Sequence, residues 1–275
     1  MGIKVGYQGK HGTFSEIAVM RYFEGQDIEQ RNYPGFPQIM DDCDAGVLDY
    51  AVLPVENTTT GVISRTYDLF KDHHVHAVGE IIVPIHENLI ASPGTKIEEI
   101  TEVYSHPEAL SQCQKFFLAH PSMKAIAYQD TAAAVSYVKS DSSHTKAALG
   151  SELAGAYYGM ETLAECVQDS DTNMTRFLVV TAKEETVQDA DKISTMLVLK
   201  HEPGSLYHAL GILAYADINM LKLESRPIVG EPFHYMFYVD FSGNLEDPIV
   251  KAAISKLKEH SIEMRILGNY KAARV

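Results

Sequence analysis

The chain has 275 residues, of which 45% are hydrophobic, and its 23 Lys and Arg against 37 Asp and Glu give a formal net charge of −14. This length predicts about two domains, and this apolar fraction predicts a packed core. The acidic balance excludes nucleic acid as a main partner, because phosphate binding needs a basic face, and it argues against an anionic membrane surface. A small anionic substrate remains compatible, because a few local cations can outweigh the average field.

The cysteines and the N-terminal residues indicate the compartment. Cys43, Cys113 and Cys166 are far apart, so neither a disulfide framework nor a CxxC metal or redox site is expected. Residues 1–7 read as a first strand and not as a signal peptide, and no apolar run is long enough to span a bilayer. We therefore expect a cytoplasmic protein with no metal and no cofactor.

The first part of the chain alternates short apolar runs with helical patterns. Strands are predicted at 3–7, 50–55, 78–85, 103–105, 125–128, 147–149 and 177–180. Helices are predicted at 14–23, 37–45, 62–71, 107–120, 131–139 and 152–158. This alternation favours βαβ units and a mostly parallel sheet. If the chain crosses from one lobe to another near 81–92 and returns near 172, this part forms two α/β lobes with a cleft between them.

Behind this part the pattern changes. Residues 182–192 are polar and charged, as is typical of a linker. Strands are then predicted at 193–199, 219–224, 235–241 and 262–270, with helices at 204–215 and 248–259. The order βαββαβ predicts a ferredoxin-like unit.

The five residues 173–177, N-M-T-R-F, lead from a polar loop into a buried-strand pattern. Thr175 and Arg176 are therefore expected at a strand mouth, where open α/β sheets keep their ligands. A threonine hydroxyl can donate a hydrogen bond, and a guanidinium can grip a carboxylate with two parallel bonds. The pair predicts an anionic small molecule with a group to be protonated.

Three more segments place polar groups at the ends of predicted strands. In the turn 9–15, Thr13 or Ser15 can cap a helix whose N–H groups attract anions. Residues 53–61, L-P-V-E-N-T-T-T-G, end a strand with more polar groups than one cap requires, which predicts ligand contact. Ser105 ends another strand, and Gln112 lies further along the helix that His106-Pro107 begins.

Together, G-x-x-G-T-F-S, P-V-E-N-T-x-x-G, S-H-P-x-x-x-x-Q and N-x-T-R-F resemble, in order and spacing, the motifs of the prephenate dehydratase family. Residues 204–210, G-S-L-Y-H-A-L, and 224–227, E-S-R-P, are similar to the two signatures of the ACT regulatory domain of these enzymes. The resemblance implies an α/β fold with a two-lobed, periplasmic-binding-protein-like catalytic domain at 1–182. A linker at 183–192 and a ferredoxin-like βαββαβ ACT domain at 193–275 would follow.

The resemblance also implies a reaction. Prephenate loses carbon dioxide and its ring hydroxyl to give phenylpyruvate, so the site must help hydroxide leave and must hold two carboxylates. The implied catalytic residues are Thr175, Arg176, Asn57, Ser105, Gln112 and Glu56, and the implied substrate contacts are Thr13, Ser15, Thr58, Gly61 and Phe177. Thr175 would donate to the leaving hydroxyl. Glu56 would repel a dianion unless protonated or paired, and Arg176 would either hold a carboxylate or support Phe177 and its loop.

For the C-terminal unit the resemblance implies feedback by L-phenylalanine. The implied effector contacts are Gly204, Ser205, Leu206, Asn219, Glu224, Ser225, Arg226 and Pro227, in a homodimer or homotetramer. The expected protein is monofunctional. Two alternatives stay open: an arogenate dehydratase, which performs the same elimination on the amino-acid form of the substrate, and a non-catalytic amino-acid-binding sensor.

Overall fold

The computed structural model describes residues 2–141 and 143–274. The chain forms two units, Met1–Thr66 with Ile81–Phe177, and Tyr67–Glu80 with Leu178–Val275. Helix α3 (Ser64–Phe70) and strands β5 (His76–Pro84) and β11 (Met174–Thr181) each contribute residues to both units. Neither unit is therefore one continuous stretch of chain.

The first unit begins with a parallel sheet in the order β2 (Ile28–Tyr33), β1 (Ile3–Gln8), β3 (Tyr50–Asn57). Helices α1 (Phe14–Tyr22) and α2 (Phe36–Asp44) connect these strands. Short strand β4 (Gly61–Val62) folds back antiparallel onto the end of β3. Residues 58–60 are consequently a hairpin turn, and α3 starts two residues later than the helix predicted at 62–71.

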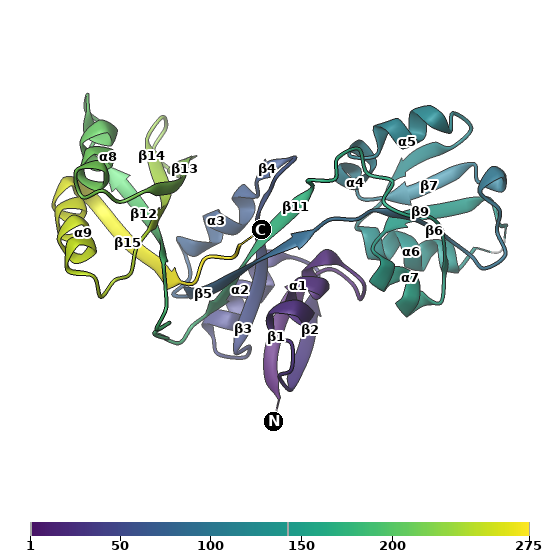
Figure 1. Ribbon diagram of the computed structural model, residues 1–275, viewed down its shortest axis with the longest axis horizontal. Coiled ribbons are helices and arrows are strands. Elements are labelled where there is room, and N and C mark those ends of the chain that lie inside the picture. Colours follow the sequence, from purple (N-terminus) through teal and green to yellow (C-terminus); the bar gives the residue numbers. More distant parts are fainter. Residues whose placement is uncertain (1, 142, 275) are drawn as a thin grey trace. The chain divides into compact units, whose positions relative to one another are not determined.

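The same unit contains a second sheet, in the order β10 (Glu161–Ala164), β6 (Asn88–Ala91), β9 (Lys146–Gly150), β7 (Glu102–Ser105), β8 (Lys124–Ala127). Its helical segments are η1 (Ile97–Glu99), α4 (Pro107–Ser111), α5 (Gln114–Ala119), α6 (Thr131–Lys139) and α7 (Glu152–Tyr158). Figure 1 shows helices on both faces of this sheet. Strands buried on both faces have nearly continuous apolar runs, and neighbouring residues then pack into different cores.

The two cores confirm this alternation. Leu89 and Leu149 belong to the cluster packed with α4 and α5, whereas Ile90 and Ala148 belong to the cluster packed with α6 and α7. The sheet is mixed, because β7 pairs in parallel with β8 and β9, while β6 pairs antiparallel with β9 and β10. The α/β class is confirmed, and the expectation of a mostly parallel arrangement holds for only part of it.

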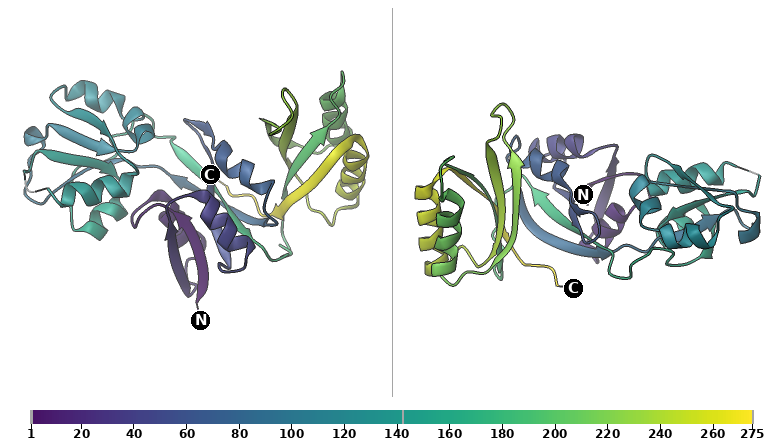
Figure 2. Two further views of the ribbon diagram at one scale, coloured as in Figure 1. Left: turned by 180° about the vertical axis from the view of Figure 1, so that it is seen from behind. Right: turned by 90° about the horizontal axis from the view of Figure 1, so that it is seen from above.

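In the second unit four strands of the ten-stranded sheet lie side by side, in the order β13 (Met220–Pro227), β14 (Tyr235–Ser242), β12 (Lys192–Leu199), β15 (Ser261–Tyr270). These strands pair antiparallel, and Gly268 of β15 lies beside Ala77 of β5. Helices α8 (Ser205–Tyr215) and α9 (Pro248–His260) cover one face of this sheet (Figure 2). The observed order is βαββαβ, as predicted.

The core of the second unit explains why both helices lie on that face. Leu213 of α8 and Leu257 of α9 join Leu197 and Val239 of the sheet in one buried apolar cluster. None of the helices in the described part of the chain has the length and apolar character that crossing a bilayer requires.

Candidate active site

The hairpin β3–β4 is tied to the start of β11 by Thr58. The Thr58 hydroxyl donates to the carbonyl of Thr172 at 2.7 Å and accepts from the N–H of Met174 at 2.9 Å, and the Thr58 N–H donates to the Met174 carbonyl at 2.9 Å. Both functions of this hydroxyl are therefore used within the protein. The predicted substrate contact Thr58 holds two segments together that lie far apart in the sequence.

The orientation of the Asn57 side chain is fixed by the turn that follows it. Asn57 Oδ1 accepts from the backbone N–H groups of Thr59 at 2.9 Å and Thr60 at 3.0 Å. Because a backbone N–H can only donate, the amide oxygen must lie on this side and the NH₂ group on the other. That NH₂ group donates to Asn173 Oδ1 at 2.8 Å and to Thr175 Oγ1 at 3.0 Å.

This polarity continues from Asn57 through Asn173 to Gln112. Asn173 uses its oxygen as acceptor from Asn57, so its NH₂ group faces Gln112 and donates to Gln112 Oε1 at 2.7 Å. We call Asn57, Asn173 and Gln112 the amide relay. Asn57 and Asn173 are buried, with exposed fractions of 8% and 2%.

The amide relay leaves two hydrogen-bond donors at its ends. The oxygen of Thr175 accepts from Asn57, and its proton meets no acceptor among the described residues. The NH₂ group of Gln112, likewise, has no acceptor in the described part of the chain, since its oxygen faces Asn173. Thr175 is 8% exposed, so the site presents a nearly dry hydroxyl donor and a half-buried amide donor.

Gln112 is brought to this position by a break in the helix predicted at 107–120. α4 ends at Ser111, and α5 starts at Gln114. The Asp169 carboxylate accepts from the N–H groups of Gln114 at 3.0 Å and Lys115 at 2.9 Å, which satisfies the N-terminus of α5. The Asp169 N–H also donates to the Gln112 carbonyl at 2.7 Å. The Asp169 carboxylate thus stabilises the start of α5, which the local sequence at 107–120 does not predict.

Glu56 and Arg176 form an ion pair beside the amide relay. Arg176 donates to Glu56 Oε2 through Nη2 at 2.7 Å and through Nε at 3.2 Å. The arginine side chain is 12% exposed and the glutamate side chain 39% exposed. Glu56 is therefore paired, which meets the condition under which a carboxylate can lie near an anionic substrate.

The Ser105 side chain lies inside the second sheet. It is fully buried, and its hydroxyl donates to the carbonyl of Leu149 at 2.8 Å, joining β7 to β9. Phe177 is also buried, 2% exposed, in β11. The contacts of the described residues join Asn57, Thr175 and Gln112, but they do not connect Ser105 to that group.

The N-terminal turn differs from the expectation that Thr13 or Ser15 caps α1. Thr13 occupies the N-cap position, but its side chain makes no capping bond and instead donates weakly to the carbonyl of Gln8 at 3.4 Å. Ser15 lies inside the helix. Glu16, also in the first turn of α1, binds back to the preceding turn, because its Oε2 accepts from the N–H of Gly12 at 2.6 Å.

Glycine is required at two predicted positions by packing and by backbone geometry. A Cβ on Gly12 would lie 2.5 Å from the Cα of Ala154, so this turn closes against α7. Ser151, at the start of α7, donates to the Gly12 carbonyl at 2.5 Å. Gly61 has φ of +82° with open space around it, so the hairpin β3–β4 needs glycine for its backbone conformation.

Asn173 and Glu87 are buried polar residues of this unit that no sequence pattern singles out for a role. Asn173 is the first letter of the N-x-T-R-F motif, and its only sequence signal is an amide directly before a buried strand. Glu87 is 2% exposed, and its Oε2 has no hydrogen-bond partner among the described residues. Burial raises the pKa of Glu87 to about 8. Nothing in the local sequence 84–89 marked this carboxylate as buried.

The predicted effector contacts lie at two places in the second unit. Gly204 is the N-cap of α8, with Ser205 and Leu206 in its first turn. The strand predicted at 219–224 extends further, because each residue of the E-S-R-P segment pairs with a residue of β14 and so belongs to β13. Arg226 donates to both carboxylate oxygens of Asp68, at 3.0 and 2.7 Å. Asn219 directly precedes β13.

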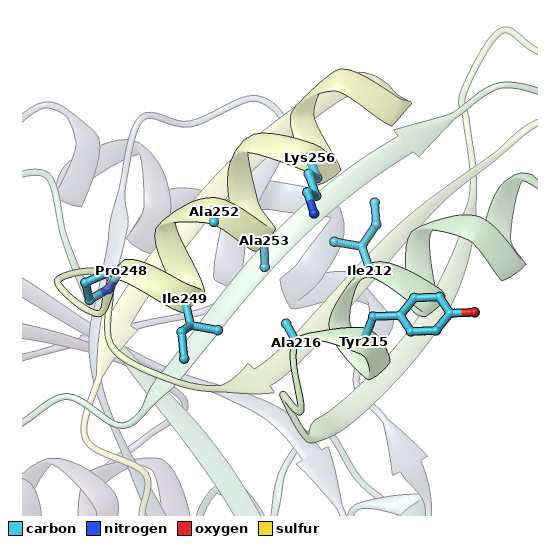
Figure 3. A pocket seen from close by; sticks show the side chains of 8 residues that line it. All are labelled: Ile212, Tyr215, Ala216, Pro248, Ile249, Ala252, Ala253 and Lys256. Atoms are coloured by element: carbon cyan, nitrogen blue, oxygen red, sulfur yellow. The ribbon is translucent and has the colours of Figure 1, made fainter.

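A groove of about 420 Å³ lies between α8 and α9, away from these residues. Figure 3 shows its mostly apolar lining, with Ile212 and Tyr215 from α8 and Ile249 and Lys256 from α9. None of the predicted effector contacts lines it. Within the described ranges, no group of three or more His, Cys, Asp or Glu side chains could hold a metal ion.

Comparison with known proteins identifies the family. Residues 5–185 match the family model for prephenate dehydratase. The chain belongs to the prephenate dehydratase family. It is 32% identical to the bifunctional chorismate mutase/prephenate dehydratase of Stutzerimonas stutzeri, over 98% of this chain and 74% of that protein.

The fold of this chain is similar, over nearly its whole length, to two solved structures. The prephenate dehydratase from Arthrobacter aurescens in complex with L-Phe superposes with a TM-score of 0.90 at 28% identity, over 98% of this chain and 90% of that one. GqqA, described as a novel type of quorum quenching acylase, gives a TM-score of 0.89 at 27% identity, over 98% of each chain.

Proposed function

We propose that this chain converts prephenate to phenylpyruvate, carbon dioxide and hydroxide. The observation that carries the proposal is the hydrogen bond from Asn57 to Thr175 Oγ1, at 3.0 Å. It occupies the oxygen of Thr175 as an acceptor and leaves the proton for the substrate. Membership of the family supplies the substrate class.

In the proposed reaction, the bond from the ring to its carboxylate breaks and its electron pair enters the ring. The bond from the ring to the hydroxyl breaks at the other side, and hydroxide leaves. Aromatisation supplies the driving force. Thr175 donates a hydrogen bond to the departing oxygen, and because threonine is a poor acid, it acts as an aimed donor in a dry site and not by full proton transfer.

The other predicted residues take supporting roles in this proposal. Gln112 donates its NH₂ group to a substrate carboxylate or carbonyl, as the polarity of the amide relay supports. Arg176 already binds Glu56, so the pair holds β3 against β11 and keeps the net charge beside the substrate near zero. Ser105 and Thr58 position the ends of their strands through bonds to the backbone. Thr13 and Gly61 shape the turns in which they lie, whereas Ser15 packs within α1 and Phe177 within β11.

A continuous spectrophotometric assay of phenylpyruvate formation tests the proposal. Prephenate, arogenate and an acylamide substrate are given in parallel to the purified chain, and phenylpyruvate, phenylalanine and the released carboxylic acid are measured as their respective products, so that the three activities are compared directly. The expected result is the highest kcat/KM on prephenate. A chain that forms no phenylpyruvate, or that turns over arogenate or the acylamide faster, contradicts the proposal. A pure sensor would bind amino acids without turnover.

For regulation, we propose that residues 1–182 form the catalytic domain, 183–192 the linker and 193–275 an ACT domain that binds L-phenylalanine. The βαββαβ order of the second unit and the L-Phe complex of the Arthrobacter aurescens relative support this. An effector inhibits only when it binds one state better than another, so L-phenylalanine is proposed to favour an inactive arrangement. Rates and thermal midpoints with and without L-phenylalanine test it; no effect on either contradicts it.

We propose further that the chain forms a homodimer or homotetramer. Strand β13 ends the strand order of its sheet, and Met220, Leu221 and Leu223 on it are exposed by 39%, 47% and 37%. An exposed apolar edge strand is a surface on which a second chain can pair. Light scattering after size exclusion should give a mass of at least two chains, and a monomer would contradict the proposal.

A further inference from the structure

Asn173 is a buried amide whose hydrogen-bonding groups are used within the protein. Its oxygen accepts from Asn57 at 2.8 Å and from the Thr59 hydroxyl at 3.3 Å, and its NH₂ group donates to Gln112 at 2.7 Å. At 2% exposure it has almost no surface of its own for a substrate. Any part in the reaction must therefore pass through its neighbours.

We propose that Asn173 is a positioning residue that orients the Gln112 amide as a donor toward the carboxylate or carbonyl groups of the substrate. The inference rests on the proposed dehydratase function for the identity of the substrate. The orientation itself follows from the hydrogen bonds of this chain.

Asn57 is the amide of the relay whose orientation cannot reverse. The backbone N–H groups of Thr59 and Thr60 both point at Asn57 Oδ1 and can only donate. The Asn57 NH₂ group must then meet the oxygen of Asn173, and the Asn173 NH₂ group must meet the oxygen of Gln112. Each link determines the next, so Gln112 is left with its donor outward.

The chemical consequence concerns an anionic substrate. A reversed Gln112 would present an oxygen to carboxylates, which is repulsive, whereas the observed orientation presents two N–H donors. The relay carries no net charge, so it does not compete with the substrate for cations. Since Gln112 is half-buried and Asn173 buried, this control operates in a partly dry site where hydrogen bonds count for more than in water.

The main test is Asn173→Asp, which keeps the shape but removes the donor. The Gln112 side chain should then turn its NH₂ group toward the introduced carboxylate and its oxygen toward the substrate. We expect kcat/KM for prephenate to fall about 10- to 100-fold, mostly through KM, the range for a hydrogen bond to a charged group. As the pH falls and the introduced carboxylate takes up a proton, it can donate again, so kcat/KM should partly recover on the acid side.

A double-mutant cycle separates this mechanism from simple charge repulsion. In a Gln112→Ala background there is no Gln112 amide to orient, so Asn173→Asp should lower kcat/KM much less than it does in the wild type. Repulsion between the new carboxylate and the substrate would instead give the same loss in both backgrounds and would overturn the proposal. Asn32→Asp on exposed β2 makes the same chemical change away from the relay and should leave kcat/KM unchanged.

Gln112→Glu is a second variant that leaves Asn173 intact. One carboxylate oxygen can accept from Asn173, and the other faces the substrate. KM should therefore rise more than in Gln112→Ala, which merely lacks the donor. Equal KM values in the two variants would contradict the proposal, whatever the stability of Asn173→Asp.

A measurement without substrate distinguishes the two failures. Hydrogen exchange of the side-chain NH₂ groups, followed by NMR, should be faster at Gln112 than at Asn57 in the wild type, and should slow at Gln112 in Asn173→Asp. If exchange at Gln112 slows in Asn173→Asp but the chain has no dehydratase activity, the proposed function is rejected and the orienting role of Asn173 is supported. An active enzyme in which the Gln112 signal is unchanged by Asn173→Asp would reject the orienting role alone.

Discussion

The two units each contain a buried polar network, and the networks end differently. The amide relay of the first unit is neutral and stops at Thr175 and Gln112, whose donors meet no acceptor in the described part of the chain. The second unit contains an ion cluster of Lys192, Glu80, Asp240, Ser194 and Tyr270. Comparing them separates the groups that hold the fold from the groups that remain available for chemistry.

Every residue of the ion cluster is bonded to another residue of the protein. Lys192 lies 2.9 Å from Glu80 and 3.5 Å from Asp240. Ser194 donates to Asp240 at 2.6 Å, and the N–H of Ala273 donates to the second oxygen of Glu80 at 3.0 Å. Buried networks are stable when each member is bonded. An open end in such a network, as at Thr175, is therefore the feature that points to a ligand.

The largest effect is expected from opening the closed network. Lys192→Met removes the cation that lies beside both buried carboxylates, so the free energy of unfolding should fall by about 3–5 kcal/mol. Urea unfolding measures this loss, and Lys200→Met, which changes an exposed lysine just after the same strand, is the matched control. A change below about 1 kcal/mol, a figure well under that range, would show that the cluster is not closed in the way described.

The next effect concerns the open end. Thr175→Ala should reduce kcat about 10²- to 10³-fold with the fold intact, the usual cost of one aimed donor. Thr175→Ser keeps the hydroxyl and should retain much of the activity. The matched control is Thr195→Ala in the second unit, whose hydroxyl is already bonded to Val239 and which should change stability but not kcat. Near wild-type turnover of Thr175→Ala would remove this hydroxyl from the mechanism.

Glu87 is a third kind of buried polar group. Its Oε2 has no hydrogen-bond partner among the described residues, and it belongs neither to the ion cluster nor to the amide relay. Its pKa is raised to about 8 by burial, above the ordinary value of 4.5. The unfolded chain therefore loses this proton at lower pH than the folded chain. The stability associated with the protonated carboxyl is complete below about pH 4.5 and is lost as the pH rises toward 8.

Glu87→Gln should remove that dependence. The variant and the wild type should have similar thermal midpoints at about pH 4.5, and the variant should be the more stable by about 1 kcal/mol or more at about pH 8, because one pKa unit corresponds to about 1.4 kcal/mol. Thermal unfolding across this range is the measurement. Parallel pH profiles for the two proteins would contradict a raised pKa at this site.

The smallest effect is expected at the half-exposed pair of Arg226 and Asp68. A double-mutant cycle with Arg226→Ala and Asp68→Ala should give a coupling of about 0.2–1 kcal/mol, as for other exposed pairs. If Arg226 also contacts the effector, Arg226→Ala should weaken the response to L-phenylalanine far more than Asp68→Ala does. An equal response in both single variants would leave Arg226 with a structural role alone.

Periodicity predicted the elements whose residues alternate or repeat clearly. β12, β14, α8 and α9 start and end within one residue of the predicted ranges, because their apolar side chains follow the period of their element. β2 was missed because I-E-Q-R-N-Y is polar and half-exposed, and β6 because four fully buried residues show no alternation. The break at Gln112 depends on Asp169, which lies 54 positions beyond Lys115 and so leaves no local signal.

The sequence motifs predicted individual residues of the site but not the contacts between them. The resemblance singled out Asn57, Thr175 and Gln112, which the structure connects through Asn173. It could not show that Asn173 is the connection, because its partners lie 116 and 61 residues away and leave no local pattern. Nor could it show that the hydroxyls of Ser105 and Thr58 are already bonded to carbonyl groups, since that depends on which strands are neighbours.

The place of β11 beside β3 has a consequence for synthesis on the ribosome. Asn57 and Thr175 are 118 positions apart, so at about 5–20 residues per second the ribosome needs roughly 6–24 seconds to deliver the second after the first. During this interval Val52, Leu53 and Val55, which end up fully buried, lack the strand that completes their sheet. Nascent chains that stall before residue 173 should therefore depend on chaperones to stay out of aggregates.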